Sequence, residues 1–249
     1  LRPPSATSIP GAASTIGCVR MTVPIYPGVK RAVGGLGSTA MMLVLSPLLV
    51  PVGIILRFTG EGEVFYTQTR IGRGGREFGI WKFATMLKDS PNLGTGTLTV
   101  TGDPRVTKVG RVLRATKVNE LPQLLNVLTG DMRFVGPRPQ VRGDFEAYAP
   151  EVREAIGAVT PGITGIGSIV FRDEQALLSR PGVEPRAFYS QQIAPYKGAL
   201  EAWYLGKRSL WTDARIVAIT GWAVLVSGSQ LVFRAFPDLP PKPDWFDEG

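Results

Sequence analysis

Histidine is absent from the 249 residues of this chain, and cysteine occurs once, at Cys18. The lack of histidine excludes Ser-His-Asp and Cys-His nucleophile systems and the usual imidazole base. A single cysteine excludes a disulfide framework within the chain and a cysteine-rich zinc site. Any acid, base or nucleophile must therefore come mainly from carboxylates.

Acidic residues are also few, with 20 Asp and Glu against 28 Lys and Arg, a net charge of +8. This balance indicates an anionic partner, which could be nucleic acid, anionic lipid or a phosphorylated substrate. No helix-turn-helix, zinc-finger or RNP pattern occurs, so we predict no nucleic-acid partner. The chain is long enough for a real core, and its 44% hydrophobic content suggests a membrane component.

Charge is missing altogether from residues 32–56, "AVGGLGSTAMMLVLSPLLVPVGIIL". A straight helix of this length could cross a bilayer core of about 30 Å, but Ser46-Pro47 and Pro51 divide it into two pieces too short to span. Lys30-Arg31 precede the segment and eleven Lys and Arg against five acids follow it up to residue 117, so both flanks favour the cytoplasmic side. We therefore expect a re-entrant helix–break–helix, in which the Ser46 hydroxyl serves backbone groups freed near Pro47. The alternative is a kinked spanning helix.

The remaining patterns predict an α+β fold, mostly helical with a small β-hairpin. "EVFYTQTRIG" and "REFGIWKF" flank the glycine turn "RGG" and predict the hairpin. In 199–226, aromatic residues alternate with Lys207, Arg208 and Arg215, which favours interfacial amphipathic helices over core helices. We expect a flexible tail without a signal peptide over 1–26, a re-entrant membrane helix over 27–58, a cytoplasmic-face domain over 59–233 and a flexible tail over 234–249.

The stretch "TKVNELPQ" (116–123) has the signals of a helix start. Asn119 is a preferred N-cap, and Glu120 suits a first turn. The apolar positions Leu121, Leu124, Leu125 and Leu128 then predict one face of a helix that ends near Gly130. The amides at such a helix start also favour phosphate, so capping and catalytic roles are compatible.

Basic residues surround this stretch in the sequence. Arg111, Arg114 and Lys117 precede the Asn-Glu pair, and Arg138 follows between two prolines in "VGPRP". The prolines restrict the backbone, and a guanidinium suits bidentate phosphate contacts. The alternative for Arg138 is a surface ion pair.

In their order, the broken apolar segment, "KFATM" (82–86), "DPRVTKVGRVLR", "NELPQLLNVLTGDM" and "VGPRP" resemble the bacterial sugar transferases, the monotopic polyprenyl-phosphate glycosyl-1-phosphate transferases. The resemblance runs from about Lys30 to about Phe233. It implies a phosphoglycosyl transferase that moves a sugar-1-phosphate from a UDP-sugar to undecaprenyl phosphate, releases UMP and uses Mg²⁺. It also implies a re-entrant membrane helix at the cytoplasmic face of the bacterial inner membrane, in contact with its lipid. The product would initiate exopolysaccharide, lipopolysaccharide or other glycoconjugate synthesis, and a homodimer is left open.

Two departures from the family pattern concern the site. Asn119 stands where the family usually has a nucleophilic Asp, and an amide cannot take that role. Ala84 stands where the family usually has Arg. The stretch "GITGIGSIVFRDEQALL" also differs from the commoner family ending and adds Asp173 and Glu174. The alternative to an active enzyme is therefore a catalytically silent relative that binds nucleotide sugar or polyprenyl phosphate.

Four sets of site residues follow from these motifs. Glu120, with Asn119, is the catalytic candidate, and Ser46 and Pro47 are the membrane candidates. Mg²⁺ needs hard oxygen ligands, for which Glu120 leads and Asp103, Asp131 and Asp173 are companions. Cationic and polar side chains would bind the phosphates and offset their repulsion. These substrate-binding candidates are Lys82, Arg105, Arg111, Arg114, Lys117, Gln123 and Arg138.

Overall fold

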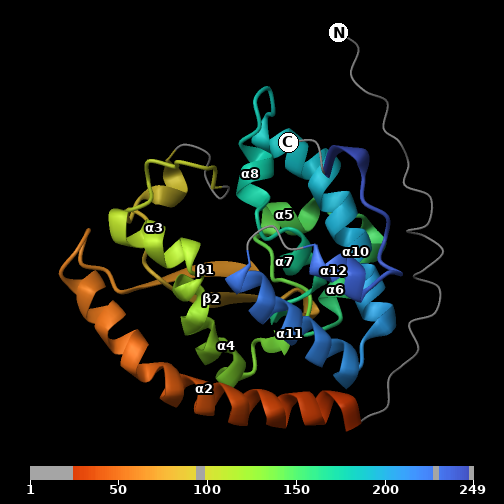
Figure 1. Ribbon diagram of the computed structural model, residues 1–249, viewed down its shortest axis with the longest axis horizontal. Coiled ribbons are helices and arrows are strands. Elements are labelled where there is room, and N and C mark those ends of the chain that lie inside the picture. Colours follow the sequence, from red (N-terminus) through yellow and green to blue (C-terminus); the bar gives the residue numbers. More distant parts are fainter. Residues whose placement is uncertain (1–24, 94–98, 227–229, 247–249) are drawn as a thin grey trace.

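The computed structural model describes residues 25–93, 99–226 and 230–246 (Figure 1). One long helix, α2, lies along one side of a domain of short helices and two small sheets. Almost all of the predicted N-terminal tail lies outside the described residues. The described fold is mostly helical with little sheet, as the sequence predicts.

The long apolar stretch forms a single helix, α2 (Ile25–Arg57), so the predicted break at Ser46-Pro47 is wrong. Pro47 has no N–H for the Leu43 carbonyl, and the Ser46 hydroxyl donates to that oxygen instead, at 2.7 Å. The predicted use of Ser46 is thus confirmed, and α2 bends rather than breaks (Figure 1). Among the described residues, α2 alone is long and apolar enough to cross a membrane, and 6% of its most apolar stretch is buried.

Small residues of α2 face the domain. A Cβ at Gly34 would lie 3.4 Å from Val127, and one at Gly37 would lie 3.0 Å from Phe134. Ser38 is fully buried beside them. Many large apolar side chains of α2 are exposed: Val33, Leu36, Met41, Leu43, Val44, Leu48, Val50, Ile54 and Ile55.

The predicted hairpin is present as β1 (Phe65–Ile71) and β2 (Glu77–Phe83), which pair antiparallel. A second, parallel pair that the sequence did not indicate joins β3 (Arg133–Val135) to β4 (Gly162–Thr164). The two backbones approach closely after β3, because a Cβ at Gly162 would lie 2.1 Å from the Gly136 nitrogen. This crossing holds the "GPRP" segment in place.

Short helices fill the rest of the domain. They are α3 (Lys108–Ala115), α4 (Leu124–Thr129), α5 (Arg142–Glu146), α6 (Pro150–Gly157), α7 (Ile166–Val170), α8 (Glu174–Leu178), α9 (Pro185–Phe188), α10 (Ala194–Lys207), α11 (Leu210–Leu225) and α12 (Leu231–Ala235). Short 3₁₀ segments occur at Arg73–Gly75, Ser90–Asn92, Val118–Gln123 and Asp244–Phe246, and a π-helical segment covers Tyr189–Ile193.

The main core surrounds α10, which is buried on nearly all sides. Trp203, Tyr204 and Leu205 are therefore core residues, and their predicted interfacial position is wrong. The next helix, α11, differs, because Leu210 and Trp211 at its start are 53% and 72% exposed. Within this region, the exposed large apolar side chains thus lie in α11 or directly after it.

Residues 234–246, where the sequence predicts a flexible tail, pack against the core. Phe236 is 3% exposed, and Phe246 contacts the rings of Phe171 and Tyr196. Arg180 donates to the carbonyls of Trp245 and Phe246. Although this segment is rich in proline, its aromatic side chains bury enough apolar surface to hold it against the core.

The helix predicted to begin at Asn119 begins differently. A 3₁₀ turn covers Val118–Gln123, and the residue before it, Lys117, is left-handed at φ 60°. Asn119 lies inside this turn, so the predicted N-cap is wrong. The predicted end at Gly130 is confirmed by its φ of 92°.

The apolar face of this segment is also shifted. Of the four leucines predicted for that face, Leu124 is buried and Leu128 is 47% exposed. The other buried positions of α4 belong to Asn126 and Val127, because the 3₁₀ turn rotates α4 relative to one continuous helix.

Candidate active site

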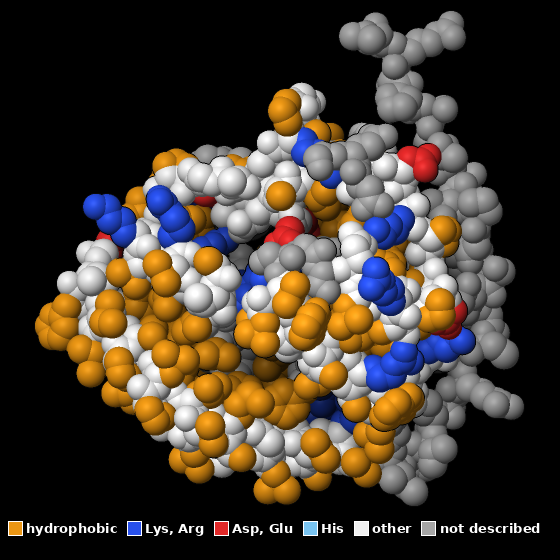
Figure 2. All heavy atoms as spheres, in the orientation of Figure 1, with side chains coloured by type: hydrophobic (Ala, Val, Ile, Leu, Met, Phe, Trp, Pro, Cys, Tyr) orange, Lys and Arg blue, Asp and Glu red, His pale blue; other side chains and the backbone are white. Residues whose placement is uncertain are grey.

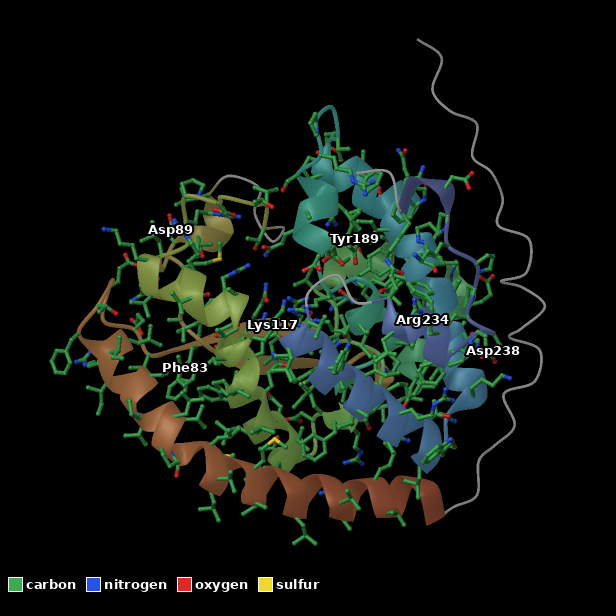
Figure 3. All side chains as sticks on the ribbon, viewed as in Figure 1. Phe83, Asp89, Lys117, Tyr189, Arg234 and Asp238 are labelled. Carbon is green, nitrogen blue, oxygen red and sulfur yellow. The ribbon has the colours of Figure 1, made fainter. Side chains whose placement is uncertain are left out.

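A cavity of about 1490 Å³ opens between the hairpin, the 3₁₀ turn at 118–123 and helices α7, α8 and α11. Most of the predicted site residues line it: Lys82, Asp103, Arg111, Arg114, Lys117, Asn119, Glu120, Arg138 and Asp173. In Figure 3, Lys117 lies near the centre of the molecule, between Phe83 and Tyr189. The structure thus brings together residues that are up to 91 positions apart, from Lys82 to Asp173.

An ion pair between Glu120 and Arg138 lies at the centre of these residues. Arg138 Nη2 is 2.8 Å from Glu120 Oε1 and 2.9 Å from Oε2. Burial alone would raise the pKa of Glu120, but the charges of Arg138, Lys82 and Lys117 outweigh it and lower that pKa to about 2. Glu120 is therefore ionised at neutral pH and sits among several cations.

Burial and mutual repulsion lower the pKa values of several surrounding cations. Burial, together with nearby Arg70, lowers the pKa of Lys82 to about 7, although Glu120 opposes the change. Burial also lowers the pKa values of Arg114 and Lys117. Such a concentration of positive charge in a cavity is suited to a polyanionic ligand.

Two features of the backbone hold the central pair. The left-handed Lys117 is the one residue other than glycine with positive φ in the described chain, and it reverses the chain just before Asn119 and Glu120. Such a conformation costs of the order of 1 kcal/mol and often marks a functional site. On the other side, Arg138 Nη1 donates to the Ile163 carbonyl at 3.3 Å.

Asn126 fixes this turn against the hairpin. Its Oδ1 accepts from the Trp81 N–H at 3.0 Å, and its Nδ2 donates to the Gly79 carbonyl at 2.8 Å. The amide thereby pairs with the β2 backbone beside Lys82. This contact sets the position of Lys82 relative to Glu120.

Three predicted residues are not part of the cavity wall. Arg105 forms a buried pair with Asp103, at 2.6 Å, and donates to the carbonyls of Ser90 and Leu93. Gln123 is 1% exposed and lies 3.4 Å from Glu120 Oε2, behind the carboxylate. Asp131 instead accepts from the Thr129 hydroxyl at 2.6 Å. Asp103 does line the cavity, but Arg105 holds its carboxylate.

The structure adds residues that the motifs did not identify. Arg70 and Gln68 share the hairpin face of Lys82, and Gln68 Oε1 accepts from Arg70 at 2.7 Å. Alternation along β1 could have identified this face, since their strand partners in register lie on one side of the sheet. The buried pair of Lys197 and Glu174 also lines the cavity, and no local pattern marks Lys197.

Part of the cavity wall is apolar. Met41 comes from α2, Leu124 from α4, Phe134 from β3, and Ala223 and Val224 from α11. The cavity therefore joins a cationic centre to apolar side chains of the long helix. Such a combination suits a ligand with both an anionic group and a hydrocarbon part.

The acidic residues fit a magnesium site that is completed by substrate. Within the described residues, no three or more Asp, Glu, His or Cys side chains gather as a metal cluster. Mg²⁺ is commonly held by one or two carboxylates together with substrate phosphates and water. Glu120 and Asp173 both line the cavity, and the charges of both raise the pKa of Lys117 against the effect of its burial.

The sequence model of the bacterial sugar transferases matches residues 25–227, which is most of the chain. The chain belongs to the bacterial sugar transferase family. The predicted resemblance is therefore confirmed, and the matched region contains α2 and all of the cavity residues named above.

Three relatives illustrate the range of this family. The UDP-glucose:undecaprenyl-phosphate glucose-1-phosphate transferase of Caulobacter vibrioides is 35% identical over 195 residues, 77% of this chain and 67% of the relative. The exopolysaccharide production protein PSS of Rhizobium leguminosarum bv. phaseoli is 34% identical over 205 residues, which cover 80% of this chain and 96% of the relative. The UDP-N-acetylgalactosamine-undecaprenyl-phosphate N-acetylgalactosaminephosphotransferase of Aeromonas hydrophila is 36% identical over 149 residues, 59% of this chain and 35% of that relative. This chain thus spans about a third of the Aeromonas protein, and the Caulobacter and Aeromonas relatives are named for different sugars.

Proposed function

We propose that this sugar transferase moves a sugar-1-phosphate from a UDP-sugar to undecaprenyl phosphate and releases UMP, as an initiating step of bacterial polysaccharide or glycoconjugate synthesis. The observation that carries the proposal is the cavity in which an ionised Glu120 lies among cations beside an apolar wall. The cations suit the diphosphate and the lipid phosphate, and the wall suits the polyprenyl chain. The named activities of the relatives support the same reaction.

Glu120 is the carboxylate that we assign to the chemistry. As nucleophile, one Glu120 oxygen would attack the β-phosphorus of the UDP-sugar, and the bond from that phosphorus to the bridging oxygen would break. UMP leaves with the bridging oxygen and its electron pair. An oxygen of undecaprenyl phosphate then attacks the same phosphorus and releases Glu120. Arg138, Lys82 and Lys117 would hold the phosphate oxygens throughout.

Mg²⁺ would be held by Glu120 and Asp173 with substrate phosphates, and when bound it would offset charge on the diphosphate. A covalent sugar-phosphate on Glu120 would establish the role of nucleophile. A metal-dependent reaction without such an adduct would instead assign Glu120 to the metal. Either result keeps Glu120 at the centre of the reaction.

The protein would be monotopic, with α2 entering and leaving the membrane on the cytoplasmic face of the inner membrane. At one end of α2, Lys30 donates to the Val135 carbonyl at 2.9 Å and pairs with Asp213 at 2.8 Å. At the other end, Leu56 packs in a cluster with Phe83. Both ends therefore contact the same domain, whereas a helix that crossed the bilayer would place them on opposite sides.

The outer surface supports this attachment. Figure 2 shows hydrophobic side chains gathered over α2 and extending toward α11. On α11, Trp222 and Leu225 are 49% and 82% exposed. An exposed apolar surface of this extent is typical of a membrane-bound face.

A panel of UDP-sugars, screened for UMP release with undecaprenyl phosphate, tests the function and identifies the sugar. Glu120→Gln should reduce release to background. Asn119→Asp tests the alternative of a silent relative, because it restores the residue that the family pattern usually has. A silent protein should gain activity from this change, whereas an enzyme adapted to Asn119 should gain little.

A further inference from the structure

We propose that the N-terminal end of α2 carries a binding site for anionic phospholipid headgroups, formed by Arg31, Arg133 and Arg208. The proposal rests on the membrane attachment proposed above. None of the three arginines lines the cavity. The site is therefore separate from the residues assigned to substrate.

Bonds to Lys30 bring the three elements together. Its ammonium group contacts β3 at the Val135 carbonyl and contacts α11 at Asp213. The neighbouring Arg31 reaches the end of α4, where a Cβ at Gly130 would lie 2.7 Å from its Nη1. The start of α2 is thus fixed against the loop that leads into β3 and against the beginning of α11.

The other two arginines follow from this arrangement. Arg133 stands two residues before Val135 on β3, and Arg208 directly follows α10, five residues before Asp213. Burial lowers the pKa of Arg133, and the charges of Arg31 and Arg73 lower it further. Burial also lowers the pKa of Lys30, and the charges of Arg133 and Arg208 lower it further while Asp213 opposes the change. Arg31 and Arg133 thus lie close to each other, and Arg133 and Arg208 both lie close to Lys30.

Asp213, the acid at this end of α2, is paired with Lys30 and not with these arginines. Among the described residues, Arg31, Arg133 and Arg208 form no ion pair within 4.0 Å. The buried Nε of Arg208 has no hydrogen-bond partner in the part of the chain that the structure describes. Asp131, the acid nearest in sequence to Gly130, is bonded to Thr129 instead. An external anion would complete the site.

The surrounding apolar residues indicate which anion this is. Leu210 and Trp211 follow Arg208 and are 53% and 72% exposed, and Val33 and Leu36 follow Arg31 and are 58% and 77% exposed. The arginines thus lie where exposed apolar surface meets charged surface, which is headgroup depth for a membrane-bound protein. Anionic lipid attracts such cations by about 1 kcal/mol each, or about fivefold per charge.

Quenching of Trp211 by brominated lipid tests the proposal. The protein would be reconstituted in two kinds of phosphatidylcholine vesicle. One contains a small fraction of brominated phosphatidylglycerol, and the other contains the same fraction of brominated phosphatidylcholine. The Trp211 signal is the difference between the parent and Trp211→Phe. We expect brominated phosphatidylglycerol to quench it at least twofold more strongly, with a smaller excess at high salt.

In the triple variant Arg31→Gln, Arg133→Gln, Arg208→Gln, the two brominated lipids should quench Trp211 equally. A control with the same charge change, Lys108→Gln, Arg142→Gln, Arg153→Gln, should keep the preference. The proposal would be overturned if both brominated lipids quenched Trp211 equally in the parent. It would also be overturned if the triple variant kept the stronger quenching by phosphatidylglycerol, or if the control variant lost it to the same extent. No quenching by either lipid would overturn the membrane attachment as well, whereas UMP release in detergent tests the reaction separately.

Discussion

Replacing Glu120 by Gln should destabilise the protein as well as stop the reaction. A pKa of about 2 in place of 4.5 corresponds to about 3 kcal/mol in favour of the ionised, folded state, at 1.36 kcal/mol per pH unit. The side chains of Glu120 and Arg138 are 22% and 25% exposed, so solvent screening reduces this to roughly 2–3 kcal/mol. Gln keeps the shape but leaves the Arg138 guanidinium without its counter-ion. We expect the melting temperature to fall by about 5–10 °C at neutral pH.

Thermal unfolding in detergent, followed by tryptophan fluorescence, measures this difference. Glu154→Gln, an exposed change on α6, is the matched control and should alter stability by less than about 0.5 kcal/mol. Because the pKa of Glu120 is lowered in the folded state, its contribution is complete above pH 4.5 and is lost as the pH falls toward 2. Variant and parent should therefore converge on acidification. Equal melting temperatures at pH 7 would refute the assigned role of the pair.

Three further predictions concern the cations and α2. Arg138→Ala should slow UMP release by about 10²-fold or more, and an unchanged rate in a folded variant would make Arg138 structural. Since the pKa of Lys82 is about 7, its charge is lost as the pH rises through 7, so KM for the UDP-sugar should rise between pH 6 and 8. Lys82→Arg should weaken that dependence, and an identical profile in the variant would exclude Lys82 as its source. Cysteines placed at Lys30 and Arg57, in a Cys18→Ser background, should both resist an impermeant thiol reagent in intact cells, whereas labelling of one flank alone would contradict the re-entrant topology.

Much of the site could be predicted because its residues lie in short, local motifs. The hairpin follows from aromatic and β-branched segments on either side of a glycine turn, and the helix end follows from the preference for glycine just after a helix, where Gly130 is left-handed. Likewise, the Ser46 hydroxyl serves the carbonyl freed by Pro47 as expected. Each of these features depends on residues a few positions apart.

Features that depend on distant contacts could not be predicted in this way. The pairing of Arg105 with Asp103 needs the loop carbonyls that complete it, so the sequence suggests two free ligands where the structure has one buried pair. Lys117 resembles an ordinary pre-helix residue until its left-handed backbone is seen. The aromatic residues of α10 would equally suit a membrane interface or a core, and only the packing around Trp203 decides for the core.

Transfer of the phosphorus atom next to the sugar tests the central claim most directly. A UDP-sugar labelled at the β-phosphorus would be incubated with the protein and undecaprenyl phosphate, and the label would be followed in the lipid fraction. We predict that the label enters the lipid in a one-to-one ratio with released UMP, and that Glu120→Gln abolishes both. Release of labelled UDP while the sugar alone enters the lipid would contradict sugar-1-phosphate transfer.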